Sequence, residues 1–205
     1  MAKYTLNYFQ LPGRVEPIRL MFHAAGVEFT DNRLSVEEWA SSKSDASRFP
    51  LHRMPTLEVG GKIYCQSMAI VRFVARELGF YGNNATDQLM IDQLCETVLE
   101  MFMQLSSIPY DLEPDVRKAK LEEFFASDKY NLPMGFLTKM LKENQNGEGF
   151  FVGDKLSLAD FQITGILILL KDIRDIKDEY PEIYALYQRV LNLEKIKKYM
   201  DSQKK

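Results

Sequence analysis

The sequence predicts an α/β part over residues 1–80 followed by an all-α part over residues 81–205. Two observations carry this prediction. The first part mixes the alternating pattern of strands with the helical period of about 3.6 residues, whereas the second part shows only the helical period. The change falls at Gly79-Phe80-Tyr81-Gly82-Asn83-Asn84, a run typical of a linker. Such an architecture narrows the choice of fold but does not by itself name a function.

The elements of the first part are expected in the order β-α-β, an irregular stretch, then β-β-α. Tyr4, Leu6 and Tyr8 alternate with polar residues, which predicts a strand. Gly60-Gly61 is typical of the two-residue turn of a hairpin. The expected strands are 4–8, 28–33, 56–59 and 62–65, and the expected helices are 17–25 and 67–78.

The second part is expected to be helical throughout. One face of a long helix is marked by Ile91, Leu94, Cys95, Val98 and Phe102. Further helical segments are expected near 115–143, 158–171, 181–190 and 193–200. The longest apolar run, Ile163 to Leu170, is far shorter than the roughly 20 residues that cross a bilayer, so it predicts a buried helix.

Composition and charge exclude several classes of partner. With 26 basic and 29 acidic residues the net charge is -3, so no nucleic-acid partner is expected. Two cysteines cannot form a disulfide framework, and the start of the chain shows no signal peptide, which together favour a cytoplasmic protein with no membrane partner. No Cys-x-x-Cys or His-x-x-x-His spacing occurs, so no metal is expected.

Three local features suggest a ligand site, although each has a structural alternative. Tyr8 ends a strand before a Gly13-Arg14 turn and a helix start, where anions are favoured, but a strand-terminal tyrosine also serves packing. Pro55 enters a strand and is either trans or cis. Ser67 is a good N-cap for the next helix, and its hydroxyl is also suited to hold a carboxylate.

Taken together and in order, the motifs are more specific than any one alone. They are Tyr4-x-Leu6-x-Tyr8-Phe9, Gly13-Arg14-x-Glu16-x-x-Arg19, Met54-Pro55-x-Leu57-Glu58-Val59, Gln66-Ser67-x-Ala69-Ile70 and Phe151-x-Gly153-Asp154-x-Leu156-Ser157-x-Ala159-Asp160-Phe161. Over essentially its whole length the chain resembles the cytosolic glutathione transferases, and among them the sigma-type group, which includes glutathione-dependent prostaglandin D synthases and cephalopod S-crystallins. The resemblance implies a thioredoxin-like N-terminal domain followed by an all-α domain.

The resemblance implies that Tyr8 and Arg14 are catalytic. A free thiol has a pKa of about 8.5, and a hydroxyl donor or a cation beside the sulfur lowers that pKa and favours the nucleophilic thiolate. Tyr8 would supply the hydrogen bond and Arg14 the charge. Glutathione would then be a co-substrate conjugated to hydrophobic electrophiles, in keeping with a role in detoxification.

The resemblance also implies which residues bind the two substrates. Trp39 and Lys43 would hold the glycine end of glutathione, the Met54 backbone would pair with the cysteinyl part with Pro55 cis, and Glu100 would reach into the site of a neighbouring subunit in a homodimer. The full glutathione set is Tyr8, Trp39, Lys43, Arg53, Met54, Pro55, Gln66, Ser67 and Glu100, and the electrophile pocket is Phe9, Phe102 and Leu105.

Ser157 and Asp160 are expected to act in folding rather than catalysis. Leu156-Ser157-x-x-Asp160-Phe161 has the form of a capping box with Asp in place of Glu, together with a hydrophobic staple. Loss of such a cap costs about 1 kcal/mol or more.

The chain departs from the family pattern at positions that bear on function. The segment between Trp39 and Pro55 is longer than in typical relatives, and His52 stands where the family has Gly, so His52 is expected to crowd the glutathione loop. Prostaglandin synthases carry a tryptophan near residues 106–108, whereas the single tryptophan here is Trp39. A conjugating transferase is therefore the expected function, and a lens S-crystallin with little activity or a prostaglandin isomerase is the alternative.

Overall fold

The structure is a computed structural model that describes residues 3–204. Its first part is built on a four-stranded mixed sheet with strand order β2-β1-β3-β4. β1 (Tyr4–Phe9) runs parallel to β2 (Thr30–Leu34) and antiparallel to β3 (Thr56–Val59), which forms the hairpin with β4 (Lys62–Cys65). The predicted order of strands and the hairpin at residues 60 and 61 are therefore confirmed.

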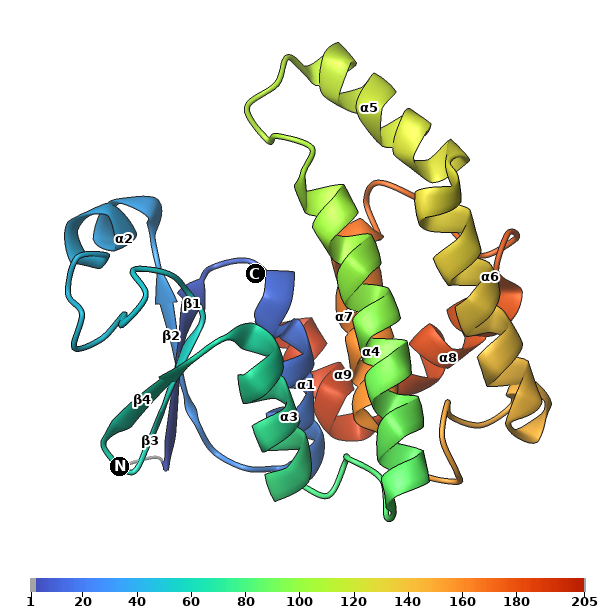
Figure 1. Ribbon diagram of the computed structural model, residues 1–205, viewed down its shortest axis with the longest axis horizontal. Coiled ribbons are helices and arrows are strands. Elements are labelled where there is room, and N and C mark those ends of the chain that lie inside the picture. Colours follow the sequence, from blue (N-terminus) through green and yellow to red (C-terminus); the bar gives the residue numbers. More distant parts are fainter. Residues whose placement is uncertain (1–2, 205) are drawn as a thin grey trace.

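Two helices lie between this sheet and the second part of the chain (Figure 1). α1 (Glu16–Ala25) follows a short 3-10 turn, η1 (Gly13–Val15), and ends at Gly26, whose φ of 69° is the left-handed conformation that suits a glycine C-cap. α3 (Ser67–Glu77) follows β4 directly. The open end of β1 is thereby placed beside the start of both helices.

One helix in the first part was not expected. α2 (Val36–Ser42) lies in the stretch that the sequence predicts as irregular. Ser35 caps it: the Ser35 hydroxyl accepts from the Glu38 N–H at 3.1 Å, and the Ser35 N–H donates to the Glu38 carboxylate at 2.7 Å. No residue of α2 is fully buried, so it has no apolar stripe, and hydrophobic periodicity does not reveal it. The Ser-x-x-Glu spacing was the available signal.

The second part is helical, and no strand occurs in it up to residue 204. Its helices are α4 (Ala85–Ser106), α5 (Pro114–Ala126), α6 (Asp128–Glu143), α7 (Leu158–Leu170), α8 (Pro181–Leu191) and α9 (Glu194–Ser202), with a short 3-10 turn η2 (Gln145–Gly147). The segment predicted as helical over 115–143 is two helices. The chain is extended at Ser127, whose φ is -91° and ψ 162°, and the Ser127 hydroxyl donates to the Phe124 carbonyl at 2.7 Å.

α7 is the central helix of the molecule (Figure 1). Most of its residues are buried, which confirms the buried helix predicted from Ile163 to Leu170. It packs against α1 from the first part and against α4 and α8 from the second, while α9 also packs on α1. There the Tyr199 hydroxyl donates to Glu16 at 2.8 Å. Helix α1 of the first part packs against α7 and α9 of the second part. The division into a domain over 1–80 and a domain over 81–205 therefore stays a prediction.

The junction between the parts is held by specific hydrogen bonds. The Leu158 N–H at the start of α7 donates to the Phe80 carbonyl at 2.8 Å, and the Tyr81 hydroxyl donates to Asp92 at 2.6 Å. The linker is thus fixed to both α4 and α7. Across residues 3–204, no helix combines the length and the apolar character needed to span a bilayer.

Candidate functional site

Tyr8 lies near the end of β1 with its hydroxyl directed at the start of the first helical turn. Its side chain is buried, with 7% exposed. The Arg14 backbone N–H donates to the Tyr8 hydroxyl oxygen at 3.4 Å. Burial raises the pKa of Tyr8, against the lowering effect of the Arg14 amide and charge. Tyr8 therefore carries its proton at neutral pH, and this proton is available to a ligand because the hydroxyl accepts, rather than donates, in its contact with Arg14.

Gly13 keeps space open beside the Tyr8 hydroxyl. Its φ is 51°, in the left-handed region. A Cβ at this position would lie 2.8 Å from the Tyr8 hydroxyl oxygen and 2.8 Å from the Leu11 side chain. Both the backbone conformation and the lack of space therefore require glycine where the sequence has it.

The Arg14 side chain joins the two parts of the molecule. Its guanidinium donates to the Met103 sulfur at 2.9 Å and lies over the Phe102 ring, 5.4 Å from the centroid. Both partners are on α4. Arg14 thus brings a cation to the junction, while its backbone N–H contacts the Tyr8 hydroxyl.

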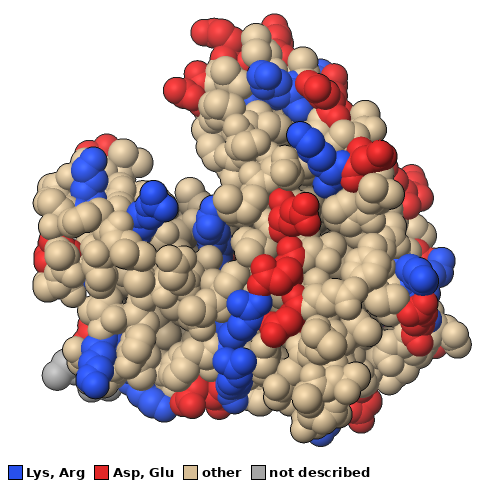
Figure 2. Space-filling view, in the orientation of Figure 1, with Lys and Arg blue, Asp and Glu red and all other residues tan. Residues whose placement is uncertain are grey.

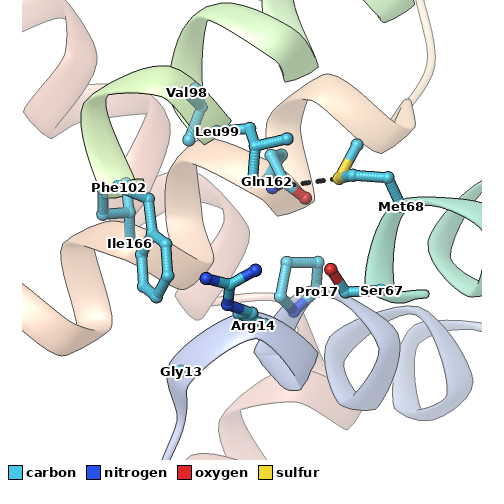
Figure 3. Close-up of a pocket in the computed structure, with 10 residues that line it drawn as sticks. All are labelled: Gly13, Arg14, Pro17, Ser67, Met68, Val98, Leu99, Phe102, Gln162 and Ile166. Carbon is cyan, nitrogen blue, oxygen red and sulfur yellow. Dashed lines mark hydrogen bonds between the residues drawn. The ribbon is translucent and has the colours of Figure 1, made fainter. Parts of the chain in front are cut away.

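A pocket lies at this junction, walled by the starts of η1, α1 and α3 on one side and by α4 and α7 on the other (Figure 3). It is lined by Gly13, Arg14, Pro17, Ser67, Met68, Val98, Leu99, Phe102, Gln162 and Ile166. Most of these side chains are apolar, and Arg14, Ser67 and Gln162 are the polar exceptions. An apolar lining with a few polar groups is typical of a small-molecule site, whereas the cavity itself, of about 20 Å³, has room for about one water.

The start of α3 forms one edge of that pocket. Ser67 was expected to be the N-cap, but the N-cap is Gln66, with a φ of 77° and no side-chain cap, and Ser67 is the first helical residue. The Ser67 hydroxyl consequently makes no hydrogen bond within residues 3–204, and it points into the pocket (Figure 3). The free amides of the first turn add a preference for an anion.

The segment from α2 to β3 forms the opposite edge of the site. Trp39 is half-buried between Phe9 and Phe49, with ring centroids 5.9 and 4.9 Å away. Phe49 is fully buried, and sequence reasoning missed it because the segment has no periodic pattern. Lys43, the C-cap of α2, is exposed and has no ion pair within the described range 3–204. The Met54-Pro55 peptide is cis.

Of the remaining predicted residues, some lie at or near the pocket and others are exposed. Phe102 lines the pocket, whereas the Phe9 ring contacts Tyr8 edge-on at 5.6 Å and Leu105 is buried with 6% exposed. Glu100 on α4 and Arg53 before the cis peptide are exposed. Figure 2 shows a notch between the part that carries α2 and the part that carries α4 and α5, with basic side chains on its walls.

Asp160 lies away from this site and is engaged by the backbone. One carboxylate oxygen accepts from the Ser157 N–H at 2.7 Å and the Ser157 hydroxyl at 2.8 Å, and the other accepts from the Phe151 N–H at 2.9 Å. Asp160 is fully buried. Burial raises its pKa to about 6, although these hydrogen bonds act to lower it.

Within residues 3–204, no three His, Cys, Asp or Glu side chains group in a way that could hold a metal ion. Among the described residues, the site offers the buried Tyr8, the Arg14 cation, the Ser67 hydroxyl and an apolar wall.

The fold is a thioredoxin-like α/β part followed by an all-helical part, and comparison with known proteins places it in one family. The model of the glutathione S-transferase N-terminal domain matches residues 4–76, and that of the C-terminal domain matches residues 99–203. S-crystallin SL11 of Nototodarus sloanii is 34% identical over 98% of this chain and 96% of its own, and glutathione S-transferase 2 of Manduca sexta is 31% identical over 98% and 97%. The structure of prostaglandin synthase D of Nilaparvata lugens superposes with a TM-score of 0.83 at 34% identity, covering 97% of each chain.

The chain belongs to the glutathione S-transferase family. It is a glutathione transferase, and glutathione is the substrate that the family uses. The resemblance stated from the motifs and the two-part fold predicted from the pattern are both confirmed at this level.

Proposed function

We propose that this transferase conjugates the thiolate of glutathione to hydrophobic electrophiles and that Tyr8 activates the thiol. The observation that carries the proposal is the Tyr8 hydroxyl, which accepts a hydrogen bond from the Arg14 amide and keeps its own proton for a ligand. A donor aimed at sulfur stabilises the charged form and lowers the pKa of the thiol. The thiol proton passes to solvent, and the thiolate is then ready to attack.

The electrophile is proposed to bind against the apolar wall of the junction pocket. Phe102 and Arg14 line this pocket, whereas Phe9, which contacts Tyr8, and Leu105, near the end of α4, do not line it and would border the electrophile beyond it. The sulfur attacks the electrophilic carbon, the new carbon–sulfur bond replaces the bond to a leaving group such as chloride, and the chloride departs as an anion. The Arg14 cation, whose position is fixed by α4, favours the negative charge on the thiolate.

Glutathione itself is proposed to lie across the notch from α3 to α2. Gln66 and Ser67 at the start of α3 suit the γ-glutamyl carboxylate, because the free amides and the free hydroxyl converge there. The Met54 backbone, Pro55 and Arg53 would meet the cysteinyl part. Trp39 and Lys43 would hold the glycyl end, where Lys43 offers an ammonium group that makes no ion pair within residues 3–204.

The first experiment compares wild type with Tyr8→Phe in the conjugation of glutathione to a chloronitrobenzene. We expect the variant to lose about ten- to a hundredfold in kcat near pH 7, because loss of one donor raises the pKa of the bound thiol by one to two units. Glutathione should still bind, because the other contacts remain. A titration of the bound thiolate by its ultraviolet absorbance should show the pKa move up towards that of free glutathione.

The control is Tyr64→Phe, which removes a hydroxyl from an exposed residue on β4. It should turn over like the wild type. A Tyr8→Phe variant with wild-type kcat and an unchanged thiol pKa would remove Tyr8 from the mechanism. If the wild type binds glutathione but scarcely conjugates it, conjugation is not the function, and one of the two alternatives described next takes its place.

Two alternatives share the same glutathione contacts. The match to an S-crystallin favours a structural protein with little activity, and the match to a prostaglandin synthase structure favours an isomerase. Turnover measured together with abundance by tissue distinguishes the structural protein from the conjugating enzyme. Product analysis with a prostaglandin endoperoxide distinguishes the isomerase from the conjugating enzyme. The set Tyr8, Arg14, Gln66 and Ser67 favours an active enzyme, and the absence of a tryptophan near residues 106–108 disfavours the isomerase.

We also propose a sigma-type, cytoplasmic homodimer with a role in detoxification. The exposed Glu100 on α4 is directed away from the chain's own core, as a residue that reaches a neighbouring site would be. Sedimentation velocity is expected to give about twice the 23.8 kDa of one chain. Glu100→Ala should then raise the KM for glutathione. A monomer at micromolar concentration would remove the Glu100 assignment and leave the Tyr8 assignment in place.

A further inference from the structure

His52 has a backbone conformation that residues with a side chain seldom adopt. Its φ is 50°, in the left-handed region that favours glycine. His52 lies in the segment between α2 and β3, at the position where the resemblance implies glycine. The main chain therefore keeps the shape that a glycine would give it, while a histidine side chain is added at that point.

The added imidazole bonds to the end of α2. Its Nδ1 lies 2.8 Å from the Lys43 carbonyl oxygen. A carbonyl only accepts, so Nδ1 carries the hydrogen in this contact. Lys43 is the C-cap residue whose own N–H donates to Trp39, and the carbonyls at a helix end have no partner within the helix. His52 supplies that partner.

The rest of the segment is folded against the same helix. The Phe49 side chain is fully buried against Trp39, and the Phe49 N–H donates to the Asp45 carbonyl at 2.8 Å. The His52 N–H in turn donates to the Phe49 carbonyl at 2.8 Å. The segment is thus attached at a buried aromatic ring and at the His52 imidazole, and only the second attachment reaches Lys43 itself.

We propose that His52 is a positioning residue that fixes Lys43 for the glycyl carboxylate of glutathione. This inference rests on the proposed function, because it assigns the Lys43 ammonium to that carboxylate. The ammonium is exposed and has no ion pair within residues 3–204, so its direction depends on the backbone that carries it. The Tyr8 hydroxyl bonds to the Arg14 N–H and not to the segment that carries His52 and Lys43. His52 should therefore act on glutathione binding and not on the chemical step.

The test compares His52→Gly with His52→Ala. Both variants lose the imidazole, so we expect the Kd and KM for glutathione to rise about threefold to fivefold in each, with kcat unchanged. The glycine variant alone relieves the left-handed backbone, so it should melt roughly 2–4 °C above the alanine variant. A purely structural role would instead make the binding loss follow stability, with alanine affected and glycine spared.

Two further measurements connect His52 to Lys43. The double variant His52→Gly with Lys43→Ala should bind glutathione no more weakly than Lys43→Ala alone, because residues that act as a unit are not additive. Glutathione esterified at its glycyl carboxylate should bind the wild type more weakly than glutathione does, and His52→Gly should discriminate less between the two. Fully additive losses, or unchanged discrimination, would overturn the proposal.

Binding by calorimetry keeps this test separate from that of the proposed function. If the wild type binds glutathione without turnover, conjugation fails as the function, and the Kd values still decide the role of His52. If the wild type turns over and His52→Gly keeps the wild-type Kd, only the role of His52 fails. A wild type that does not bind glutathione would overturn both.

Discussion

Arg19→Met is expected to lower the free energy of unfolding by about 3–5 kcal/mol, because it breaks a buried ion pair and leaves its partner charge uncompensated. Arg19 is fully buried. Its guanidinium bonds to Asp31 at 3.0 Å, to Glu16 at 3.2 Å and to the Leu11 and Phe9 carbonyls at 2.7 and 3.2 Å. These two carbonyls lie at the end of β1, just after Tyr8, and in the turn that follows the strand. Activity should therefore fall together with stability, which urea unfolding and conjugation assays on the same sample will measure.

Two matched variants separate charge from geometry in this cluster. Arg19→Lys keeps the cation but lacks the planar fork, so it should lie between wild type and Arg19→Met. Tyr199→Phe removes one hydroxyl from Glu16 and should cost about 1–2 kcal/mol. A free energy of unfolding for Arg19→Met within about 1 kcal/mol of the wild-type value would show that the cluster does not stabilise the turn.

Asp160→Ala is expected to cost about 3 kcal/mol, which is more than the loss of an ordinary helix cap. The substitution leaves the Ser157 and Phe151 amides buried without an acceptor, and each unsatisfied buried group costs about 1–3 kcal/mol. Urea unfolding measures the loss. The conjugation rate per folded molecule should stay at the wild-type value, because Asp160 makes no contact with the junction pocket.

Ser157→Ala is the matched control for the Asp160 prediction. It removes only the hydroxyl that donates to the carboxylate and keeps the Ser157 N–H, so about 1 kcal/mol is expected. Equal losses in the two variants would show that the hydroxyl, and not the pair of backbone amides, accounts for the stability. A drop in kcat of folded Asp160→Ala would contradict the assignment of Asp160 to folding.

The parts of the fold that could be predicted are those whose side chains separate core from solvent. The apolar residues of β1, Tyr4, Leu6 and Tyr8, alternate and are all buried, although Asn7 between them is buried as well, and α7 is buried on nearly every side, so both patterns could be recognised. α2 was missed because it buries no residue fully, and the division between α5 and α6 was missed because apolar residues continue across Ser127. Hydrophobic periodicity indicates which residues are buried, and it gives no information where a single hydrogen bond determines a turn.

The candidate site divides in the same way. Tyr8, Gly13 and Arg14 could be placed because they are close in sequence and the turn between strand and helix fixes them. The contacts of Arg14 with Phe102 and Met103 join residues almost ninety positions apart. Phe49 and the His52 contact lie in a segment with no repeating pattern. Such contacts depend on how the helices and strands pack against one another, and a local sequence pattern does not predict that packing.

The contact between α9 and α1 has a consequence for the order of events during synthesis. Tyr199, whose hydroxyl bonds to Glu16, is made 183 residues after it. The sheet and α1 can form while the chain is still growing, as early domains commonly do. The turn behind Tyr8, however, acquires its last buried partner only when α9 has emerged from the ribosome. A nascent chain should thus form its sheet and α1 early, whereas the surroundings of Tyr8 are complete only late.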